Sequence, residues 1–365
     1  MSRRLAEPSC HSYLGDSLRD TKTRQRIEVN LDKIYDILLV PLADVVLFPG
    51  ETIPLRLQDQ NLVNQIKHIV QTSDLLGQEG SDQLIGVVNI GYNRRNTSLS
   101  KFGTTVEIKA SHCGRMDTQY SHSDSNAEEV ILTGKGRYRF QILKVRTAER
   151  GVIFAQARLL EDSRIAHFPL RPELDSFPHW VSVVNSPAML AKTAYKLVET
   201  SLFWMVSLAT TTVSPKRTRT QLNDTDIPKI PDVYTDREER YGPLSYVCGA
   251  ELDPVGFSYF LAANLPVPTE KLQGLLEAPD VVQRLRLCIR LLEDGAGKVL
   301  ACAACRLPLA AKQQVFTVPG AEGVTGAYVN PHGAVHQTIT VRKLQTSRCV
   351  LLHGAPTVQD SWFPG

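Results

Sequence analysis

The stretch ILLVPLADVVLFPGETIPLRL, residues 37–57, decides the fold of the first half of the chain. Short runs of apolar and β-branched residues are broken at Pro41, at Pro49 and Gly50, and at Pro54. Pro and Gly set turns, so this pattern predicts short strands with turns between them. We expect the apolar residues of these strands to fill a barrel-like core.

The residues that follow extend this pattern. Apolar residues recur at helical spacing after Asp59, which predicts an amphipathic helix with Asp59 or Asn61 near its cap. Gly134 and Gly136 indicate a bend or bulge, and the polar segment 111–127 is typical of a long hairpin loop. Further strands are predicted at 84–92, 102–110, 129–145 and 152–160.

Helical spacing returns in the second half of the chain. It is found between Trp180 and Leu208, where Pro187 suits an early helical turn, and a linker rich in Thr, Pro and charge follows. Two more helices are predicted at 268–276, with Thr269 as a cap, and at 280–292.

Charge and composition exclude several classes of function. The 365 residues include 41 Lys and Arg against 38 Asp and Glu, and a net charge of +3 gives no footprint for nucleic acid. The charged start has no apolar core of a secretory signal, and no run reaches transmembrane length, so we expect a soluble intracellular protein. Among seven cysteines, the close pair Cys302 and Cys305 suggests a metal site before a disulfide.

Enzyme motifs are not evident. The segment 295–298, GAGK, ends like a phosphate loop, but Val299 stands where Ser or Thr is required. Neither HExxH nor GxSxG occurs. The sequence therefore lacks these familiar signatures of nucleotide-binding and hydrolytic sites.

Three stretches resemble the N-terminal domain of Lon proteases: residues 38–57, FGTTVEIKA at 102–110 and VILTGKGRYRFQILKV at 130–145. The resemblance implies that Phe48, Pro49 and Gly50 form a turn and that the segment 136–139, GRYR, is a glycine-arginine β motif. Turn and core chemistry explain these residues as determinants of the fold. The Lon protease modules for ATP hydrolysis and proteolysis have no motif here.

The later segments resemble the cereblon family in their order: residues 253–294, then CAAC at 302–305, GAYVNPHGAVHQTITV at 326–341 and DSWFPG at 360–365. The resemblance implies a non-catalytic substrate receptor of a cullin-RING ubiquitin ligase, in the cytoplasm and nucleus. It also implies that a helical insert, from Trp180 to about Leu208, docks the β-propeller adaptor known as the damage-specific DNA-binding protein. An apolar helical stripe is also typical of internal core.

The same resemblance implies a thalidomide-binding (CULT) domain with one zinc ion held by two Cys-x-x-Cys pairs. Cys302 and Cys305 match the first pair, and the second pair is missing from this sequence. A structural zinc site needs four ligands, so we expect a half site and a loosely packed C-terminal segment.

The ligand pocket of that family is an aromatic cage for a cyclic imide, covered by a loop that meets the substrate. Trp362 matches one cage residue, and Asn330, Pro331 and His332 match the loop. The other cage residues would follow Gly365, so imide binding is doubtful. Residues 330–333 also suit a plain β-turn.

These observations predict an α+β protein, mostly β. Its expected parts are a flexible arm at 1–33, a Lon-like β domain at 34–165, a helical insert and bundle at 166–298, and a truncated CULT domain at 299–365. The expected function is recruitment of protein targets for ubiquitination. The alternative is a truncated protein that binds the adaptor without recognising a target and competes with intact receptors.

Overall fold

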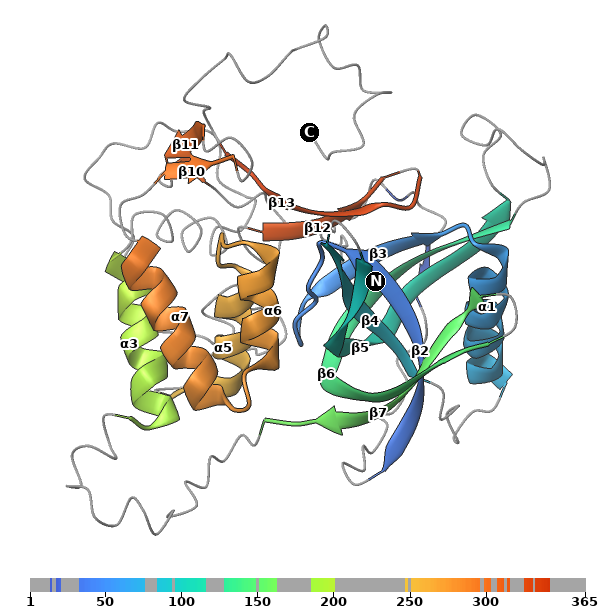
Figure 1. The fold of residues 1–365 in the computed structure, drawn as a ribbon, viewed down its shortest axis with the longest axis horizontal. Coiled ribbons are helices and arrows are strands. Elements are labelled where there is room, and N and C mark those ends of the chain that lie inside the picture. Colours follow the sequence, from blue (N-terminus) through green and yellow to red (C-terminus); the bar gives the residue numbers. More distant parts are fainter. Residues whose placement is uncertain are drawn as a thin grey trace, which may run out of the picture.

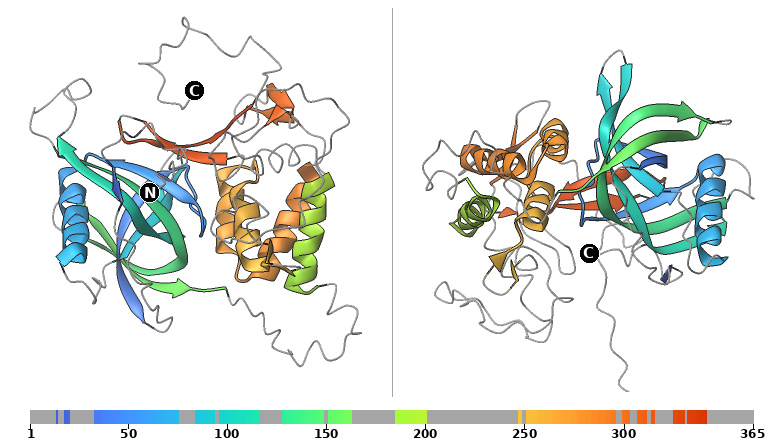
Figure 2. Two further views of the ribbon diagram at one scale, coloured as in Figure 1. Left: turned by 180° about the vertical axis from the view of Figure 1, so that it is seen from behind. Right: turned by 90° about the horizontal axis from the view of Figure 1, so that it is seen from below.

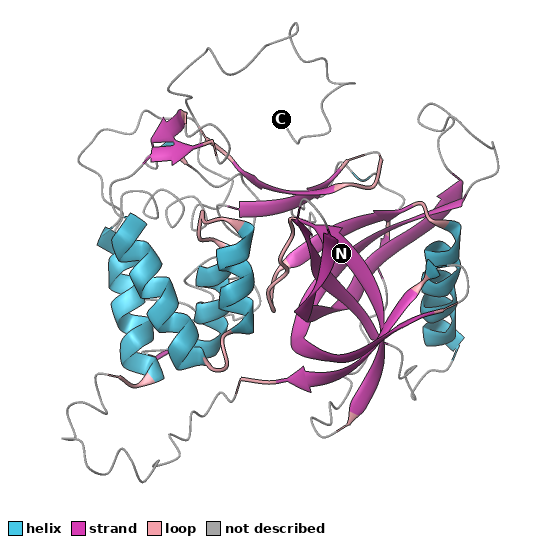
Figure 3. Ribbon diagram, viewed as in Figure 1, coloured by secondary structure: helices cyan, strands magenta, loops and turns pink. Residues whose placement is uncertain are grey.

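The computed structural model places a group of helices beside a β-barrel, with a β-hairpin across one end of both (Figure 1). The described residues form the mixed α+β structure that the sequence predicts, with strands predominating (Figure 3). The structure describes residues 14, 18–20, 33–75, 84–93, 96–115, 128–148, 151–162, 185–200, 247–248, 251–295, 299–302, 307–311, 314–315, 325–330 and 332–341.

The β-barrel closes because β5 pairs with both β4 and β6. The hydrogen-bonded order is β5, β4, β2, β7, β6 and back to β5, with β3 added beside β6 and β1 beside β5. Strands β2 and β4 run parallel, and the chain passes between them through β3 and α1. The elements are β1 (Arg19–Asp20), β2 (Ile34–Ala43), β3 (Thr52–Leu57), α1 (Gln60–Leu75), β4 (Leu84–Asn93), β5 (Asn96–Arg115), β6 (Glu128–Thr147) and β7 (Ile153–Leu160).

The predicted turn at Phe48, Pro49 and Gly50 packs against the glycine motif of β6. Gly50 donates its N–H to the carbonyl oxygen of Gly136 at 2.9 Å, and Gly136 donates to the carbonyl oxygen of Glu51 at 2.8 Å. A Cβ on Gly136 would lie 2.4 Å from the carbonyl oxygen of Phe48, so the close approach requires glycine. Both segments act as fold determinants, as predicted.

The four consecutive residues 45–48 contribute side chains to two different cores. Val45 and Leu47 are buried in the core between the barrel, α1 and the hairpin, which we call the barrel core. Val46 and Phe48 are buried in the core among the helices, which we call the helix core. Extended backbone sends alternate side chains to opposite sides, so one strand-like segment forms a shared wall between the barrel and the helices.

The helical group consists of α3 (Pro187–Thr200), α5 (Pro254–Ala263), α6 (Thr269–Glu277) and α7 (Val281–Gly295). It lies on one side of the barrel, and α1 lies on the opposite side, as two further views show (Figure 2). The predicted cap Asp59 is confirmed, since its carboxylate accepts the N–H of Asn61 at 2.9 Å.

Two expectations about local structure are wrong. Pro268, not Thr269, precedes the first residue of α6, and its position has no side-chain cap. The segment expected to be a loop from Ser111 continues as strand to Arg115, because it still pairs with β6. Polar residues suit a strand with one solvated face as well as a loop, which is why composition misled the prediction.

The remaining elements are short strands that form three antiparallel pairs. β10 (Val299–Ala301) pairs with β11 (Pro308–Ala311), β12 (Thr325–Val329) with β13 (Val335–Ile339), and β8 (Val247–Cys248) with β9 (Glu251–Leu252). Tyr328 and Val329 are buried at 4% and 1% exposure. For residues 325–330 and 332–341 the structure therefore departs from the expected loose packing, since side chains of this hairpin pack in both cores.

Candidate functional site

The turn between β12 and β13 carries two of the predicted binding residues. The N–H of Asn330 donates to the carbonyl oxygen of Ala334 at 3.0 Å, and its side-chain oxygen accepts from the N–H groups of His332 and Ala334 at 3.0 and 2.9 Å. Asn330 thus closes the turn with its side chain, and His332 is exposed. The predicted Pro331 lies outside the described residues.

The tip of this hairpin rests on the barrel. Gly333 has a φ of 83°. A Cβ on it would lie 2.6 Å from the carbonyl oxygen of Arg56, so both the conformation and the space require glycine. Arg56 itself holds Glu129 through two hydrogen bonds of 2.8 and 2.9 Å. The ion pair of Arg56 with Glu129 therefore links β3 to β6, and the tip of the hairpin rests on the backbone of β3.

The strands of the hairpin are also tied to the helices. The hydroxyl of Thr325 donates to the carbonyl oxygen of Ala263 at 2.6 Å, at the end of α5. The side-chain amide of Gln337 donates to the carbonyl oxygen of Val46 at 3.1 Å, on the shared wall. The position of the turn is therefore set by the barrel and by the helices together.

The predicted metal ligands are only partly visible. Cys302 is a half-buried cysteine between β10 and β11, and its N–H donates to the carbonyl oxygen of Leu307 at 2.9 Å. Cys305 and Trp362 lie outside the described residues. Within the described part of the chain, no three His, Cys, Asp or Glu side chains gather in a way that could hold a metal ion. The zinc half site remains a prediction.

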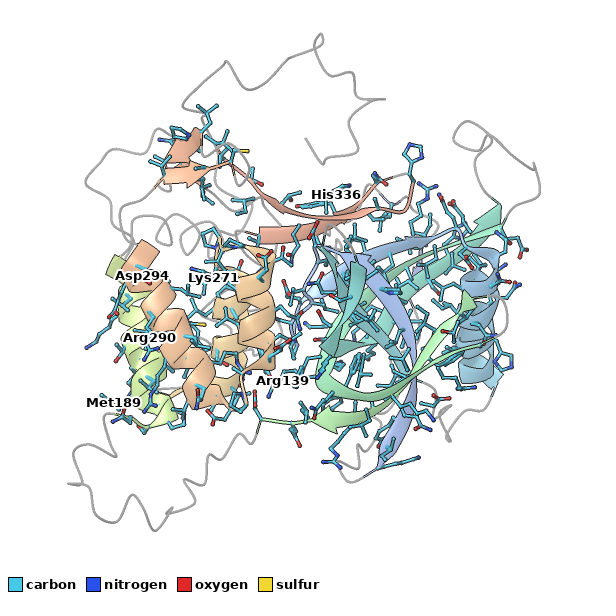
Figure 4. All side chains as sticks on the ribbon, in the orientation of Figure 1. Arg139, Met189, Lys271, Arg290, Asp294 and His336 are labelled. Atoms are coloured by element: carbon cyan, nitrogen blue, oxygen red, sulfur yellow. The ribbon has the colours of Figure 1, made fainter. Side chains whose placement is uncertain are left out.

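A second surface is formed by two neighbouring helices, α3 and α7. Each exposes one large apolar side chain, Met189 at 37% and Leu287 at 36%. Figure 4 shows Met189 and Arg290 on this side of the molecule, away from the barrel. Residues 185–200 are the described part of the predicted insert, and residues 203–205 lie outside it. What we call the α3–α7 face comprises Met189, Lys192, Lys196, Arg286, Leu287 and Arg290, all exposed.

Sequence reasoning missed a buried charged cluster between the barrel and the helices. Arg139 on β6 and Arg284 on α7 both bond the carboxylate of Asp162. Tyr259 on α5 donates its hydroxyl to the same carboxylate at 2.5 Å. Burial raises the pKa of Tyr259 above its ordinary value, so that its hydroxyl keeps the proton that it donates. No local motif reports such a cluster, because its members come from distant parts of the chain.

A cysteine lies beside this cluster. Cys288 follows Arg284 by one helical turn and is fully buried. Burial raises the pKa of the Cys288 thiol to about 12, although the nearby Arg284 charge acts in the opposite direction. The thiol is therefore protonated at neutral pH and acts as a small apolar side chain of the helix core.

None of the helices in the described residues combines the length and apolarity needed to span a membrane.

Comparison with known proteins identifies the family. Residues 36–294 match the model of the ATP-dependent protease La (LON) substrate-binding domain. The chain is 26% identical to cereblon of Gallus gallus, over 98% of this chain and 74% of that protein. It is 27% identical to cereblon of Xenopus tropicalis over the same shares, and 25% identical to cereblon of Danio rerio over 98% of this chain and 77% of that protein.

Two solved structures show limited similarity. A Lon N-terminal domain protein from Xanthomonas campestris gives a TM-score of 0.37 at 18% identity and covers 70% of this chain and 98% of its own. The N-terminal domain of a Mycobacterium avium complex Lon protease gives 0.39 at 11% identity and covers 71% and 98%. The assignment rests on the family model and on the sequence relatives: the chain belongs to the LON substrate-binding domain family and is a distant homologue of cereblon.

Proposed function

We propose that the chain is a non-catalytic substrate receptor of a cullin-RING ubiquitin ligase. The observation that carries the proposal is the homology with cereblon along 98% of the chain. A receptor holds a target near the ligase, so that transfer follows from a high effective concentration and no catalytic group is required of the receptor itself. We expect it to act in the cytoplasm and nucleus.

The α3–α7 face suits the adaptor, the damage-specific DNA-binding protein. Its apolar centre, Met189 and Leu287, is the kind of anchor that fills a partner's pocket. The same two helices expose four cations, Lys192, Lys196, Arg286 and Arg290, and charges at a rim steer association and set register. A partner surface with an apolar pocket and an acidic rim would complement this face.

The hairpin turn suits the target. Asn330 and His332 lie on a turn closed by its own hydrogen bonds, and the exposed imidazole of His332 can contact a target. Trp362 could supply one wall of an imide pocket, and Cys302 with Cys305 could supply two of four zinc ligands. Both remain proposals for this chain.

The adaptor assignment is tested by placing negative charge at the two apolar anchors. Met189→Glu combined with Leu287→Glu should weaken capture of the purified adaptor by tenfold or more, roughly the effect of losing one hot spot. The matched control is Leu143→Glu combined with Val145→Glu, because these residues on β6 are exposed at 48% and 46% on the barrel. Equal capture by both double variants would contradict the assignment.

The full chain should be used in this experiment. A deletion of residues 299–365 would remove the hairpin that fills part of both cores, so a loss of capture would not report the docking surface. The target assignment is tested separately, by comparing the ubiquitination of bound proteins with the parent protein and with His332→Ala. Adaptor capture without any recruited target would favour the alternative in which the chain competes with other receptors.

A further inference from the structure

One buried carboxylate joins the β-barrel to the helices. Asp162 follows β7, and its side chain is 3% exposed. Its Oδ1 accepts from Nη2 of Arg139 at 2.7 Å, and its Oδ2 accepts from the hydroxyl of Tyr259 at 2.5 Å and from Nη2 of Arg284. Strand β6 and helices α5 and α7 therefore meet at a single group.

The two arginines extend this contact to further elements. Nη1 of Arg139 donates to the carbonyl oxygens of Leu276 and Ala278 at 2.8 and 2.6 Å, at the C-terminal end of α6. Nε of Arg284 donates to the hydroxyl oxygen of Ser258 at 2.9 Å, on α5. A cation at a helix C-terminus is stabilised by unpaired carbonyl groups, so Arg139 is held on α6 as well as on Asp162. Figure 4 shows Arg139 between the helices and the barrel.

The charges in this cluster do not cancel. Two guanidinium groups, with side chains 2% and 0% exposed, share one carboxylate. The ring of Tyr259, whose centroid lies 3.9 Å from the guanidinium carbon of Arg284, and the end of α6 supply partial negative charge. Among the described residues, Nε of Arg139 and Nη1 of Arg284 find no hydrogen-bond partner. Within the described part of the chain, Asp162 is thus the one full negative charge bonded to both cations.

Buried ion pairs contribute little net stability compared with apolar packing, and in some proteins their role is to specify one geometry. The shared wall at Val46 and Phe48 is apolar, and apolar contact is not directional. The bonds at Asp162 are directional and reach β6, α5 and α7 at once, and Arg139 extends the contact to the end of α6. We propose that Asp162 is the positioning residue that fixes the orientation of the helices against the barrel.

This orientation has a functional meaning that rests on the proposed receptor function. The α3–α7 face belongs to the helices, whereas the tip of the hairpin rests on the barrel through Gly333 and Arg56. Asp162 would therefore set the distance and angle between the adaptor side and the target side. Transfer by proximity depends on that geometry.

The test measures orientation apart from stability. Spin-labelled amino acids placed at Ala188 on α3 and at Leu143 on β6, both exposed, report the distance between the helices and the barrel. Asp162→Asn keeps the shape of the side chain and removes its charge. We expect the distance distribution to broaden and to shift from that of the parent protein, while circular dichroism retains its helix and strand signals.

A double variant separates positioning from stability. Asp162→Asn with Arg284→Met removes one buried cation along with the carboxylate, so thermal stability should return toward that of the parent. The distance distribution should remain broad, because the bond to α7 and the charge-assisted bonds of the carboxylate are still missing. A distribution as narrow as the parent's in the double variant would overturn the proposal and leave Asp162 a purely stabilising residue.

Tyr259→Phe decides the question if neither Asp162 variant folds. It removes one hydrogen bond to Asp162 and keeps the ring beside Arg284, so the protein should fold with a smaller broadening. An unchanged distribution in Tyr259→Phe would then refute the proposal. The distance measurement needs no adaptor, and adaptor capture is read in the separate experiment above, so failure of one idea is distinguishable from failure of the other.

Discussion

The barrel and the helices are held together by two joints of different chemistry. At the Asp162 joint, two buried guanidinium groups bond one buried carboxylate. At the hairpin joint, Val329 and Val335 pack in the barrel core, and Thr325 and Gln337 bond backbone carbonyls. Removing one member of the Asp162 joint should strongly lower the free energy of unfolding, because a buried charge is left without its partner. The second can lose one contact and keep the others, so the two joints should respond differently to single substitutions.

The largest effect is expected at the Asp162 joint. Asp162→Ala leaves two buried guanidinium groups without their shared carboxylate, and breaking such a pair costs about 3–5 kcal/mol of the free energy of unfolding. Urea unfolding at pH 7 measures this loss. Adding Arg284→Met should recover a large part of it, and a loss below about 1 kcal/mol in the single variant would show that the joint is not coupled in this way.

A smaller effect is expected at the hairpin joint. Gly333→Ala forces a side chain into a left-handed conformation and against the carbonyl oxygen of Arg56, at a cost of about 1–3 kcal/mol. Hydrogen exchange should show faster exchange in residues 325–339, with the barrel strands unchanged.

Gly274→Ala is the control for that substitution. Gly274 lies within α6, and a Cβ there would meet nothing within 4 Å. Alanine should therefore stabilise this helix by about 0.5–1 kcal/mol. Equal effects at both glycines would mean that the tip of the hairpin is not seated on Arg56.

The smallest effect is expected for charges at the barrel surface. Partial burial raises the pKa of Glu107, but hydrogen bonds from Arg137 and Lys109 outweigh it, so the pKa lies below its ordinary value of 4.5. A lowered pKa in the folded protein adds stability above pH 4.5, and this stability is lost as the pH falls through the folded-state pKa.

Glu107→Gln should therefore lower the thermal midpoint slightly at pH 7 and leave it unchanged in strong acid. Parallel melting curves of the variant and the parent at the two pH values measure the difference. The same difference at both pH values would exclude the ion pairs as its source. An exposed ion pair contributes little to stability. The difference between the effects of Glu107→Gln and Asp162→Ala therefore measures how much burial increases the cost of removing a charge.

The sequence predicted the barrel well, because its signals are local. The Pro and Gly residues around Phe48 and the glycines of β6 mark turns and close approaches whatever lies elsewhere in the chain. Asp59 was found as a helix cap for the same reason. At the candidate site, the turn at Asn330 follows from its own residues, since its side chain closes it.

Other features could not be predicted so easily. Helix α5 shows no amphipathic period, because seven consecutive residues from Phe257 to Ala263 are buried. Asp253 followed by Pro254 is a start signal that could have revealed it, since the Asp side chain accepts the N–H of Val255. The Asp162 joint has no sequence signal of this kind, as its three side-chain partners lie 23, 97 and 122 positions from Asp162.

The shared wall at Val46 and Phe48 also bears on how the chain folds during synthesis. These side chains leave the ribosome with the first strands, yet their partners in the helix core, such as Phe257, follow about 200 residues later. At a synthesis rate of about 5–20 residues per second, the side of the wall that faces the helix core stays uncovered for roughly 10–40 s. A nascent barrel would present an apolar strip during that interval, so chaperone binding should concentrate on it until α5 to α7 emerge.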